Sequence, residues 1–347
     1  MRIDLFCQII DNFGDIGVCW RLARQLVAER GCEVRLVVDH LGAFRVIAPE
    51  IEPGLTQQFL RGVEIVAWSA ADSLVPRPVV IEAFACNPPA SYVEAMAVRS
   101  PKPVWINLEY LSAEGWVDKI HGMPSAHQRL PLTKYFFCPG FTEASGGLIR
   151  EITVAAENSP PVNRDYPARV FAFAYPHAPV HTLTEALATA GVPSTVTLAA
   201  PLSQCGANWK TTRPVPQTQF DALLAQFDFL IVRGEDSFVR AQWAAKPFLW
   251  HIYPTDDGAQ WVKLDAWLDR YCLGLEASAG EALRNASHAF NAVKNHAAPR
   301  LPFELLAQNL DALAAHAVRW RDTLMQQTDL ATRLLQFAAM HKDHNLG

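Results

Sequence analysis

Hydrophobic and polar positions alternate in blocks along the first part of the chain, where short apolar runs precede longer amphipathic segments. The run from Ile3 to Ile10 predicts a buried strand, and apolar residues at helical spacing between positions 16 and 30 predict a helix. Further strands are expected at 34–38, 63–67, 79–84 and 104–107. This rhythm is typical of a parallel, doubly wound sheet, so it predicts a Rossmann-like α/β domain.

The rhythm stops at a polar, proline-rich stretch from 157 to 167, which we interpret as a linker. Beyond it, apolar runs predict strands at 170–174, 194–198, 229–232 and 247–251, and amphipathic segments predict helices at 182–190, 219–225 and 237–245. Residues 303–342 are rich in Leu and Ala and are also predicted to be helical and to pack across one or both domains. The expected organisation is one domain at 1–156 and a second Rossmann-like domain at 168–347 that carries the C-terminal helices. Ligands of such folds bind at the carboxyl ends of the strands, so two such domains predict a central cleft.

Composition narrows the class of protein. The chain has 347 residues, enough for two buried cores, and it is 50% hydrophobic. Its formal net charge is -5, which does not indicate a nucleic-acid partner and fits better a partner with exposed Arg or Lys. No apolar run approaches the roughly 20 residues of a membrane span, and the start lacks a signal-peptide pattern. We therefore expect a cytoplasmic protein with no membrane partner.

Cysteine and histidine usage argues against a metal site. The 7 cysteines are scattered and never form a C-x-x-C pair, so they are expected to be buried, reduced thiols. The 11 histidines include no H-E-x-x-H helix. We expect neither a bound metal nor another cofactor.

The first candidate site is the turn between the first predicted strand and helix, which reads Ile-Asp-Asn-Phe-Gly-Asp-Ile-Gly-Val from position 10. Its glycines permit a tight turn and close approach of a ligand. Asp11 and Asp15 place two carboxylates within one turn of each other. The sequence is neither a dinucleotide fingerprint nor a Walker motif. A purely structural alternative is that Asp15 or Asn12 caps the helix.

The second candidate site is the strand–turn–helix segment from Phe229 to Ala241. Ser237 lies at the predicted helix N-terminus, where backbone N–H groups attract a diphosphate, and Arg233 adds a positive charge. Glu235 and Asp236 would repel phosphate, so at least one of them is expected to face elsewhere. A capping role on a surface helix is the alternative.

Other candidate residues have weaker signals. Phe173 and Tyr175 alternate at a strand end, where they would stack on a base or belong to ordinary sheet core. Tyr253 ends another strand, and Gln217 looks like an ordinary loop residue.

Residues 11–18 with 20–24, together with 233–242, closely resemble the protein-arginine rhamnosyltransferases that modify bacterial elongation factor P. Supporting matches occur, in family order, at 81–86, 107–114, 146–151 and 246–254. The resemblance implies a GT-B fold, with two Rossmann-like domains facing a central cleft. It further implies TDP-β-L-rhamnose as donor, inversion at the anomeric carbon and no metal. The implied acceptor is an arginine of elongation factor P, which the modification activates for translation of polyproline stretches.

The same resemblance assigns the domains and residues. The first domain would bind the acceptor and the second would bind the nucleotide sugar. Asp15 is implied as the general base, with Asp11 and Glu235 as the other catalytic residues. The implied substrate-binding residues are Asn12, Phe13, Gly14, Phe173, Tyr175, Gln217, Arg233, Asp236, Ser237 and Tyr253.

Two departures from the family pattern change the expectations. Pro214 stands where members usually carry a Phe that helps hold the thymine, so stacking on the base is expected to be weaker or shared differently. The chain is also shorter between the linker and Trp209, where contact with the partner would be trimmed.

Three alternatives remain at this point. One is a GT-B transferase with a different acceptor, and another is a nucleotide-sugar binding module without catalysis. The third is a nicotinamide-dependent oxidoreductase, against which the missing glycine fingerprint counts.

Overall fold

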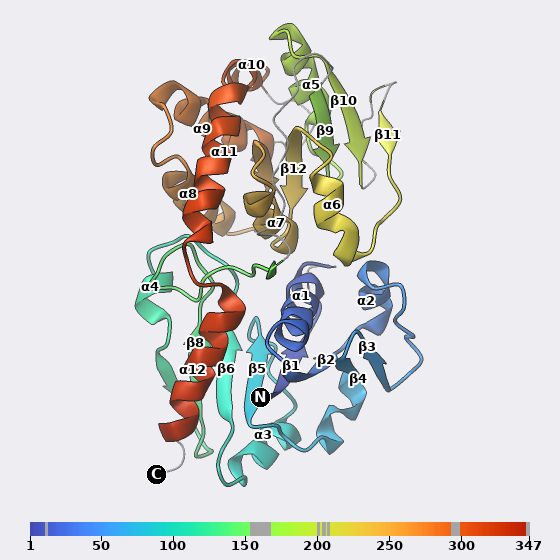
Figure 1. The fold of residues 1–347 in the computed structure, drawn as a ribbon, viewed down its shortest axis with the longest axis vertical. Coiled ribbons are helices and arrows are strands. Elements are labelled where there is room, and N and C mark those ends of the chain that lie inside the picture. The colour runs from blue at the N-terminus through green and yellow to red at the C-terminus, as the bar shows by residue number, and fades with distance from the viewer. Residues whose placement is uncertain are drawn as a thin grey trace. The chain divides into compact units, whose positions relative to one another are not determined.

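A computed structural model describes residues 1–10, 13–152, 168–199, 202, 206, 209–292 and 299–344 (Figure 1). The chain divides into two compact units, of which the first comprises Met1–Ala156 with Gln327–Gly347 and the second comprises Glu157–Gln326. Each unit is built on its own sheet. The predicted linker at 157–167 lies outside the described residues.

The elements of the first unit follow in chain order. They are β1 (Arg2–Cys7), α1 (Gly14–Ala28), β2 (Glu33–Val38), α2 (Leu41–Ile47), β3 (Gln57–Leu60), β4 (Val63–Ala67), the 3-10 helix η1 (Trp68–Ser73), β5 (Val79–Ala83), α3 (Ala90–Ala97), β6 (Val104–Leu108), α4 (Val117–Ile120), β7 (Pro124–Ala126), β8 (Thr133–Phe137) and, after the second unit, α12 (Leu330–His344).

The sheet of the first unit has the strand order β3-β4-β2-β1-β5-β6-β8-β7. The six inner strands pair in parallel, and the edge strands β3 and β7 are antiparallel to their neighbours. This order around β1 is that of a Rossmann-type sheet, so the predicted domain type is confirmed. Because the inner strands are parallel, the segments that follow β1, β5 and β6 all leave the same edge of the sheet.

Both faces of this sheet are buried, as the alternation along β1 shows. Ile3, Leu5 and Cys7 belong to one hydrophobic cluster, which α1 covers. Phe6 belongs to the other cluster, where it packs against Tyr92 of α3 and Trp68 of η1. Two covered faces explain why the strand reads as a continuous apolar run.

The last helix, α12, corrects the predicted domain assignment, which gave all of 168–347 to the second domain. Leu330, Leu334 and Phe337 of α12 lie in the same hydrophobic cluster as β1 and α1, and α12 lies along the sheet of the first unit near β6 (Figure 1). Asp329 caps its N-terminus by accepting a hydrogen bond from Thr332 N (3.1 Å). The chain therefore returns to the first unit before it ends.

The elements of the second unit follow in chain order. They are β9 (Ala168–Ala172), α5 (Val180–Thr189), β10 (Ser194–Leu198), β11 (Lys210–Thr211), the 3-10 helix η3 (Gln217–Gln219), α6 (Phe220–Leu224), β12 (Phe229–Arg233), α7 (Asp236–Ala244), β13 (Phe248–His251), α8 (Ala259–Tyr271), α9 (Ala277–Asn291), α10 (Leu301–Gln308) and α11 (Leu310–Met325).

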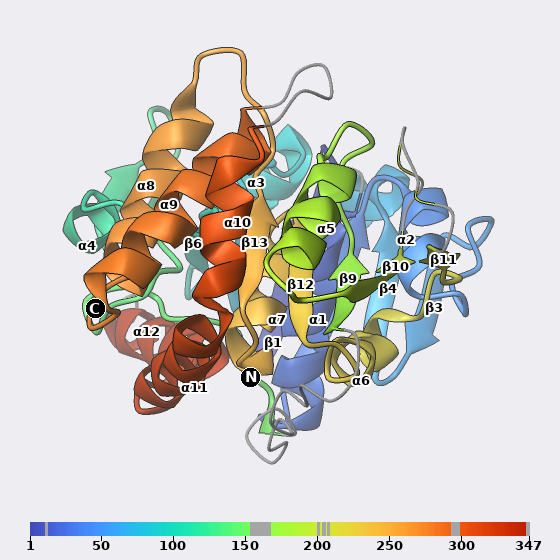
Figure 2. The same ribbon diagram turned by 90° about the horizontal axis from the view of Figure 1, so that it is seen from above.

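The sheet of the second unit is all-parallel, with the strand order β11-β10-β9-β12-β13. Its central strand is β9, and the sheet is Rossmann-like, as predicted. Helix α10 packs against both α5 and α9 (Figure 2).

Five of the six described cysteines are buried and Cys272 is half-buried, while Cys205 lies outside the described residues. No helix in the described part of the chain combines the length and apolar character that a membrane span requires.

Candidate functional site

Asp15 is the buried carboxylate at the start of α1, with 2% of its surface exposed. The residue at the N-cap position is Phe13, which makes no side-chain cap, and Gly14 is the first helical residue. Asp15 lies inside the helix, and its Oδ2 accepts a hydrogen bond from Ile10 N (2.8 Å), just after β1. The alternative in which Asp15 caps the helix is therefore wrong. Asp11 and Asn12, predicted as catalytic and binding residues, lie outside the described residues.

The second oxygen of Asp15 is bound from the segment that follows β6. Tyr110 donates its hydroxyl hydrogen bond to Asp15 Oδ1 over 3.0 Å. The Tyr110 ring stacks on Phe84, which follows β5, with ring centroids 4.2 Å apart and an interplanar angle of 12°. Residues that follow three neighbouring parallel strands thus converge on this carboxylate.

The turn that carries Phe84 has an unusual backbone. Phe84 and Ala85 have φ of 58° and 53°, in the left-handed region that non-glycine residues seldom adopt. Phe84 N donates to Leu108 O (2.7 Å), and Ala85 N donates to Asn107 Oδ1 (3.1 Å). The end of β6 therefore holds the strained turn in place.

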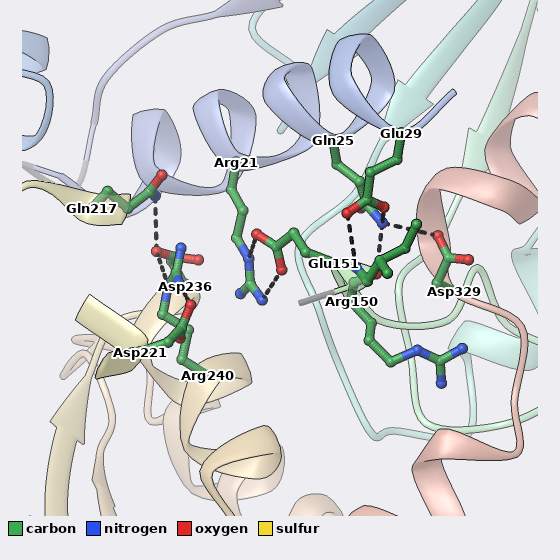
Figure 3. Close-up of polar contacts among 11 residues, drawn as sticks. Arg21, Gln25, Glu29, Arg150, Glu151, Gln217, Asp221, Asp236, Arg240 and Asp329 are labelled. Atoms are coloured by element: carbon green, nitrogen blue, oxygen red, sulfur yellow. Dashed lines mark hydrogen bonds and ion pairs between the residues drawn. The ribbon is translucent and has the colours of Figure 1, made fainter. Parts of the chain in front are cut away.

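Beyond Asp15, α1 is anchored by a buried ion pair. Arg21 has a fully buried side chain, and its Nε and Nη2 donate to Glu151 Oε1 and Oε2 over 2.7 and 2.6 Å (Figure 3). One turn further, Gln25 Nε2 donates to Arg150 O (2.6 Å) and to Glu29 Oε2 (3.0 Å). The bidentate pair of Arg21 and Glu151, together with the hydrogen bond from Gln25 to Arg150 O, fixes α1 against the segment before residue 152.

In the second unit, Arg233 at the end of β12 lies against two aromatic rings. Its guanidinium carbon is 4.5 Å from the ring centroid of Phe173 and 4.9 Å from that of Tyr175. Both contacts are of cation–π type. Three residues that were predicted to contact the nucleotide thus form one cluster at the carboxyl ends of β9 and β12.

Tyr175 extends this cluster to the end of β13. Its ring lies edge-on to His251 (5.0 Å) and to the exposed Tyr253 (5.8 Å). Tyr175 N donates to His251 Nδ1 (3.2 Å). Burial, aided by His177 and Arg233, lowers the pKa of His251 to about 3, so the imidazole stays neutral and accepts this hydrogen bond.

Asp236, the first residue of α7, is held by protein groups. Its Oδ2 accepts from Gln217 Nε2 (2.9 Å) and from Arg240 Nε (3.0 Å) (Figure 3). The buried Arg240 also pairs with Asp221. The charge of Asp236 is therefore offset within the unit. Gln217 and Asp236, both predicted to bind nucleotide, bind each other here.

The N-terminus of α7 presents the remaining predicted residues. Glu235 occupies the N-cap position without a side-chain cap, and Gly234 before it has φ of 63°, which favours glycine. Ser237 is nearly buried, and its hydroxyl donates to Arg233 O. The hydroxyl is thus used within the turn, so the α7 dipole and its first N–H groups are what this terminus offers to an anion.

Four residues of these clusters had no role predicted from the sequence: Tyr110, Phe84, Arg240 and Phe220. The proximity of Tyr110 to Asp15 could have been predicted, because both follow parallel strands and lie at the same edge of the sheet. Phe220 begins α6, and its ring lies 6.1 Å from that of Phe173. No group of three or more His, Cys, Asp or Glu side chains within the described ranges is arranged to hold a metal ion.

Comparison with known proteins gives a consistent result across the whole chain. Residues 3–339 match the family described as elongation factor P (EF-P) rhamnosyltransferase EarP. The chain is 42% identical to the protein-arginine rhamnosyltransferase of Pseudomonas putida over 377 aligned positions, which cover 96% of this chain and 97% of that protein. It is 40% identical to the protein of the same description from Pseudomonas aeruginosa, with 97% and 98% covered.

Solved structures agree on the fold. The chain is similar to a structure that concerns EarP-mediated arginine glycosylation of translation elongation factor EF-P, with a TM-score of 0.62, 29% identity, and 98% and 99% of the two chains covered. It also resembles the spinosyn forosaminyltransferase SpnP, with a TM-score of 0.54, 14% identity, and 98% and 99% covered. The latter similarity shows the fold alone, which is GT-B as predicted.

Proposed function

Because this chain belongs to the family of elongation factor P rhamnosyltransferases, we propose that it transfers L-rhamnose from TDP-β-L-rhamnose to an arginine of elongation factor P. It is an enzyme, a glycosyltransferase of the protein-arginine rhamnosyltransferase kind. The transfer inverts the anomeric carbon and activates the factor for translation of polyproline stretches. The reaction takes place in the cytoplasm, where translation needs the factor.

The acceptor poses the main chemical difficulty. A guanidinium group has a pKa above about 12, and its lone pairs are delocalised over the plane, so it is a poor nucleophile. A carboxylate that accepts one of its N–H bonds, and then the proton, raises the electron density on that nitrogen. We assign this role to Asp15. We assign to Asp11 the role of accepting hydrogen bonds from the other N–H groups of the guanidinium.

The observation that carries this assignment is how Asp15 is held. Its carboxylate is buried, it does not cap α1, and each of its oxygens accepts from a donor on a different segment, Ile10 N and the Tyr110 hydroxyl. Two donors on different segments thus fix the direction of the carboxylate.

Donor binding is assigned to the second unit. The cluster of Phe173, Tyr175 and Arg233 offers aromatic faces beside a positive charge, which suits a base and a diphosphate. The N-terminus of α7 adds its dipole. Arg233 and this helix stabilise the leaving diphosphate, while Glu235 holds the acceptor or offsets positive charge on the sugar.

The first expected result concerns donor affinity. Arg233→Ala removes a charge-assisted contact worth about 1.5–3 kcal/mol, so the Kd for TDP-rhamnose should rise roughly 10- to 150-fold in calorimetry. Ser237→Ala should have a smaller effect, because its hydroxyl serves Arg233 O within the turn. Arg284→Ala is the matched control, since Arg284 forms a surface ion pair with Asp269 and should leave the Kd unchanged. Equal Kd values for Arg233→Ala and Arg284→Ala would remove Arg233 from the donor site.

A second expected result is that the reaction proceeds in EDTA. Arg233 and the α7 N-terminus provide the charge that a divalent cation would otherwise supply to the leaving diphosphate. Intact-mass measurement of elongation factor P, incubated with the enzyme and TDP-rhamnose, should show one added deoxyhexose with and without EDTA. Loss of transfer in EDTA, restored by Mg²⁺ or Mn²⁺, would contradict the metal-free reaction. Unmodified factor in both samples would favour another acceptor or a binding module without catalysis.

A further inference from the structure

Two different kinds of donor bind the oxygens of Asp15. Its hydroxyl donates to Asp15 Oδ1 (3.0 Å), whereas Oδ2 is bound by Ile10 N (2.8 Å). A backbone N–H has a fixed direction, but a phenol hydroxyl is directed only as well as its ring is held. The placement of the Tyr110 ring therefore decides how firmly the carboxylate of Asp15 is oriented.

The ring of Tyr110 is held by Phe84. The two rings are nearly parallel, with centroids 4.2 Å apart and an interplanar angle of 12°. Phe84 is 7% exposed, so its own ring is packed on its other sides. Tyr110 itself is 37% exposed, and the stack on Phe84 limits the swing of its ring.

The backbone at Phe84 is strained. Its φ of 58° and that of Ala85, 53°, lie where non-glycine residues are disfavoured. Phe84 N donates to Leu108 O, and Ala85 N donates to Asn107 Oδ1, so the turn is held by the strand that leads to Tyr110. Backbone strain of this kind clusters where a precise geometry serves function.

We propose that Tyr110 is a positioning residue, which the strained turn at Phe84 holds so that its hydroxyl orients the carboxylate of Asp15 toward the acceptor guanidinium. This inference rests on the proposed role of Asp15 as general base. The reaction itself needs no atom from Tyr110. Its hydroxyl keeps Asp15 Oδ1 in one orientation, and the proton of the acceptor goes to Asp15.

The test is a double-mutant cycle with Tyr110→Phe and Asp15→Asn, measured as single-turnover rates at saturating donor and acceptor. Tyr110→Phe keeps the stack on Phe84 and removes only the hydroxyl. Its rate should fall about tenfold, the size expected for one hydrogen bond to a charged group, while donor affinity and Tm stay unchanged. In the Asp15→Asn background the same change should lower the rate less than about twofold, because the group that Tyr110 orients no longer acts as a base.

Tyr92→Phe is the matched control. Tyr92 also donates its hydroxyl hydrogen bond to a buried carboxylate, that of Asp4 within β1. This variant should lower the Tm but leave the rate of the folded enzyme unchanged. If Tyr110 had only a structural role, Tyr110→Phe would likewise lower the Tm and leave the rate unchanged.

The outcomes distinguish a failure of the role proposed for Tyr110 from a failure of the role proposed for Asp15. An unchanged rate in Tyr110→Phe, with a defective Asp15→Asn, would overturn the inference alone. An equal loss in both backgrounds would also overturn it, because Tyr110 would then act independently of Asp15, for example by touching the acceptor. A wild-type rate in Asp15→Asn would instead overturn the base assignment on which the inference rests.

Discussion

Asp15→Asn is expected to lower the single-turnover rate by roughly 10²- to 10⁴-fold, the loss typical of a missing general base. The variant should still fold, because an amide has nearly the shape of a carboxylate and its oxygen can accept the hydrogen bond from Ile10 N or Tyr110. Donor affinity should not change, since the proposed donor contacts belong to the second unit. The amide is a poor proton acceptor, and this difference alone accounts for the lost rate.

A matched control for this variant is Asp39→Asn. Asp39 is an exposed carboxylate that accepts a hydrogen bond from Ile9 N (3.0 Å), one residue before the N–H that binds Asp15. Its replacement should leave the rate close to that of the unchanged enzyme. If Asp15→Asn and Asp39→Asn both kept the rate with normal melting, the base would have to be sought elsewhere, with Glu235 the next candidate.

Arg21→Met is expected to destabilise the first unit by about 3–5 kcal/mol, the effect of breaking one side of a buried ion pair. Arg21 is fully buried, and its replacement removes the bidentate partner of Glu151, whose side chain is only 16% exposed. The pair joins α1, which carries Asp15, to the segment at residue 151. Urea unfolding of the first unit should therefore show a clearly lower midpoint.

The exposed pair of Arg61 and Glu50 is the control for Arg21. Both side chains are 47% exposed, so Arg61→Met should change stability by no more than about 1 kcal/mol. Similar losses in the two variants would contradict the view that burial gives the Arg21 pair its importance.

The strand rhythm of the sequence predicted most strands of both sheets, because these strands are short apolar runs covered on two faces. It missed the inner strand β8, which reads Thr-Lys-Tyr-Phe-Phe and is fully buried only at its last residue, and the exposed two-residue strand β11. The edge strand β3 reads Gln-Gln-Phe-Leu, and β7 reads Pro-Ser-Ala, so neither shows that pattern. The helical character of α12 and packing across one or both domains were predicted, but not which core the helix joins. Leu330, Leu334 and Phe337 suit any apolar surface, and the contacts of Asp329 with Arg30 and Gln25 span about three hundred residues of chain.

The turns of the candidate site that follow strands were predictable from the sequence. Contacts between side chains that lie far apart in the sequence were less so. The turns at Asp15 and Arg233 follow β1 and β12, and parallel strands direct such turns to one edge of a sheet. The i, i+4 spacing of Asp236 and Arg240 is visible in the sequence. The hydrogen bond from Gln217 to Asp236 is not, since nothing in the sequence around Gln217 indicates a partner 19 residues away.

The most direct test of the proposed function is peptide-level mass spectrometry of elongation factor P after incubation with TDP-rhamnose. The enzyme should add one deoxyhexose, and fragmentation should locate it on an arginine side chain. Asp15→Asn enzyme, which binds the donor as before, should leave nearly all of the factor unmodified over the same time. Factor that stays unmodified with the unchanged enzyme, or a sugar found on a residue other than arginine, would contradict the account.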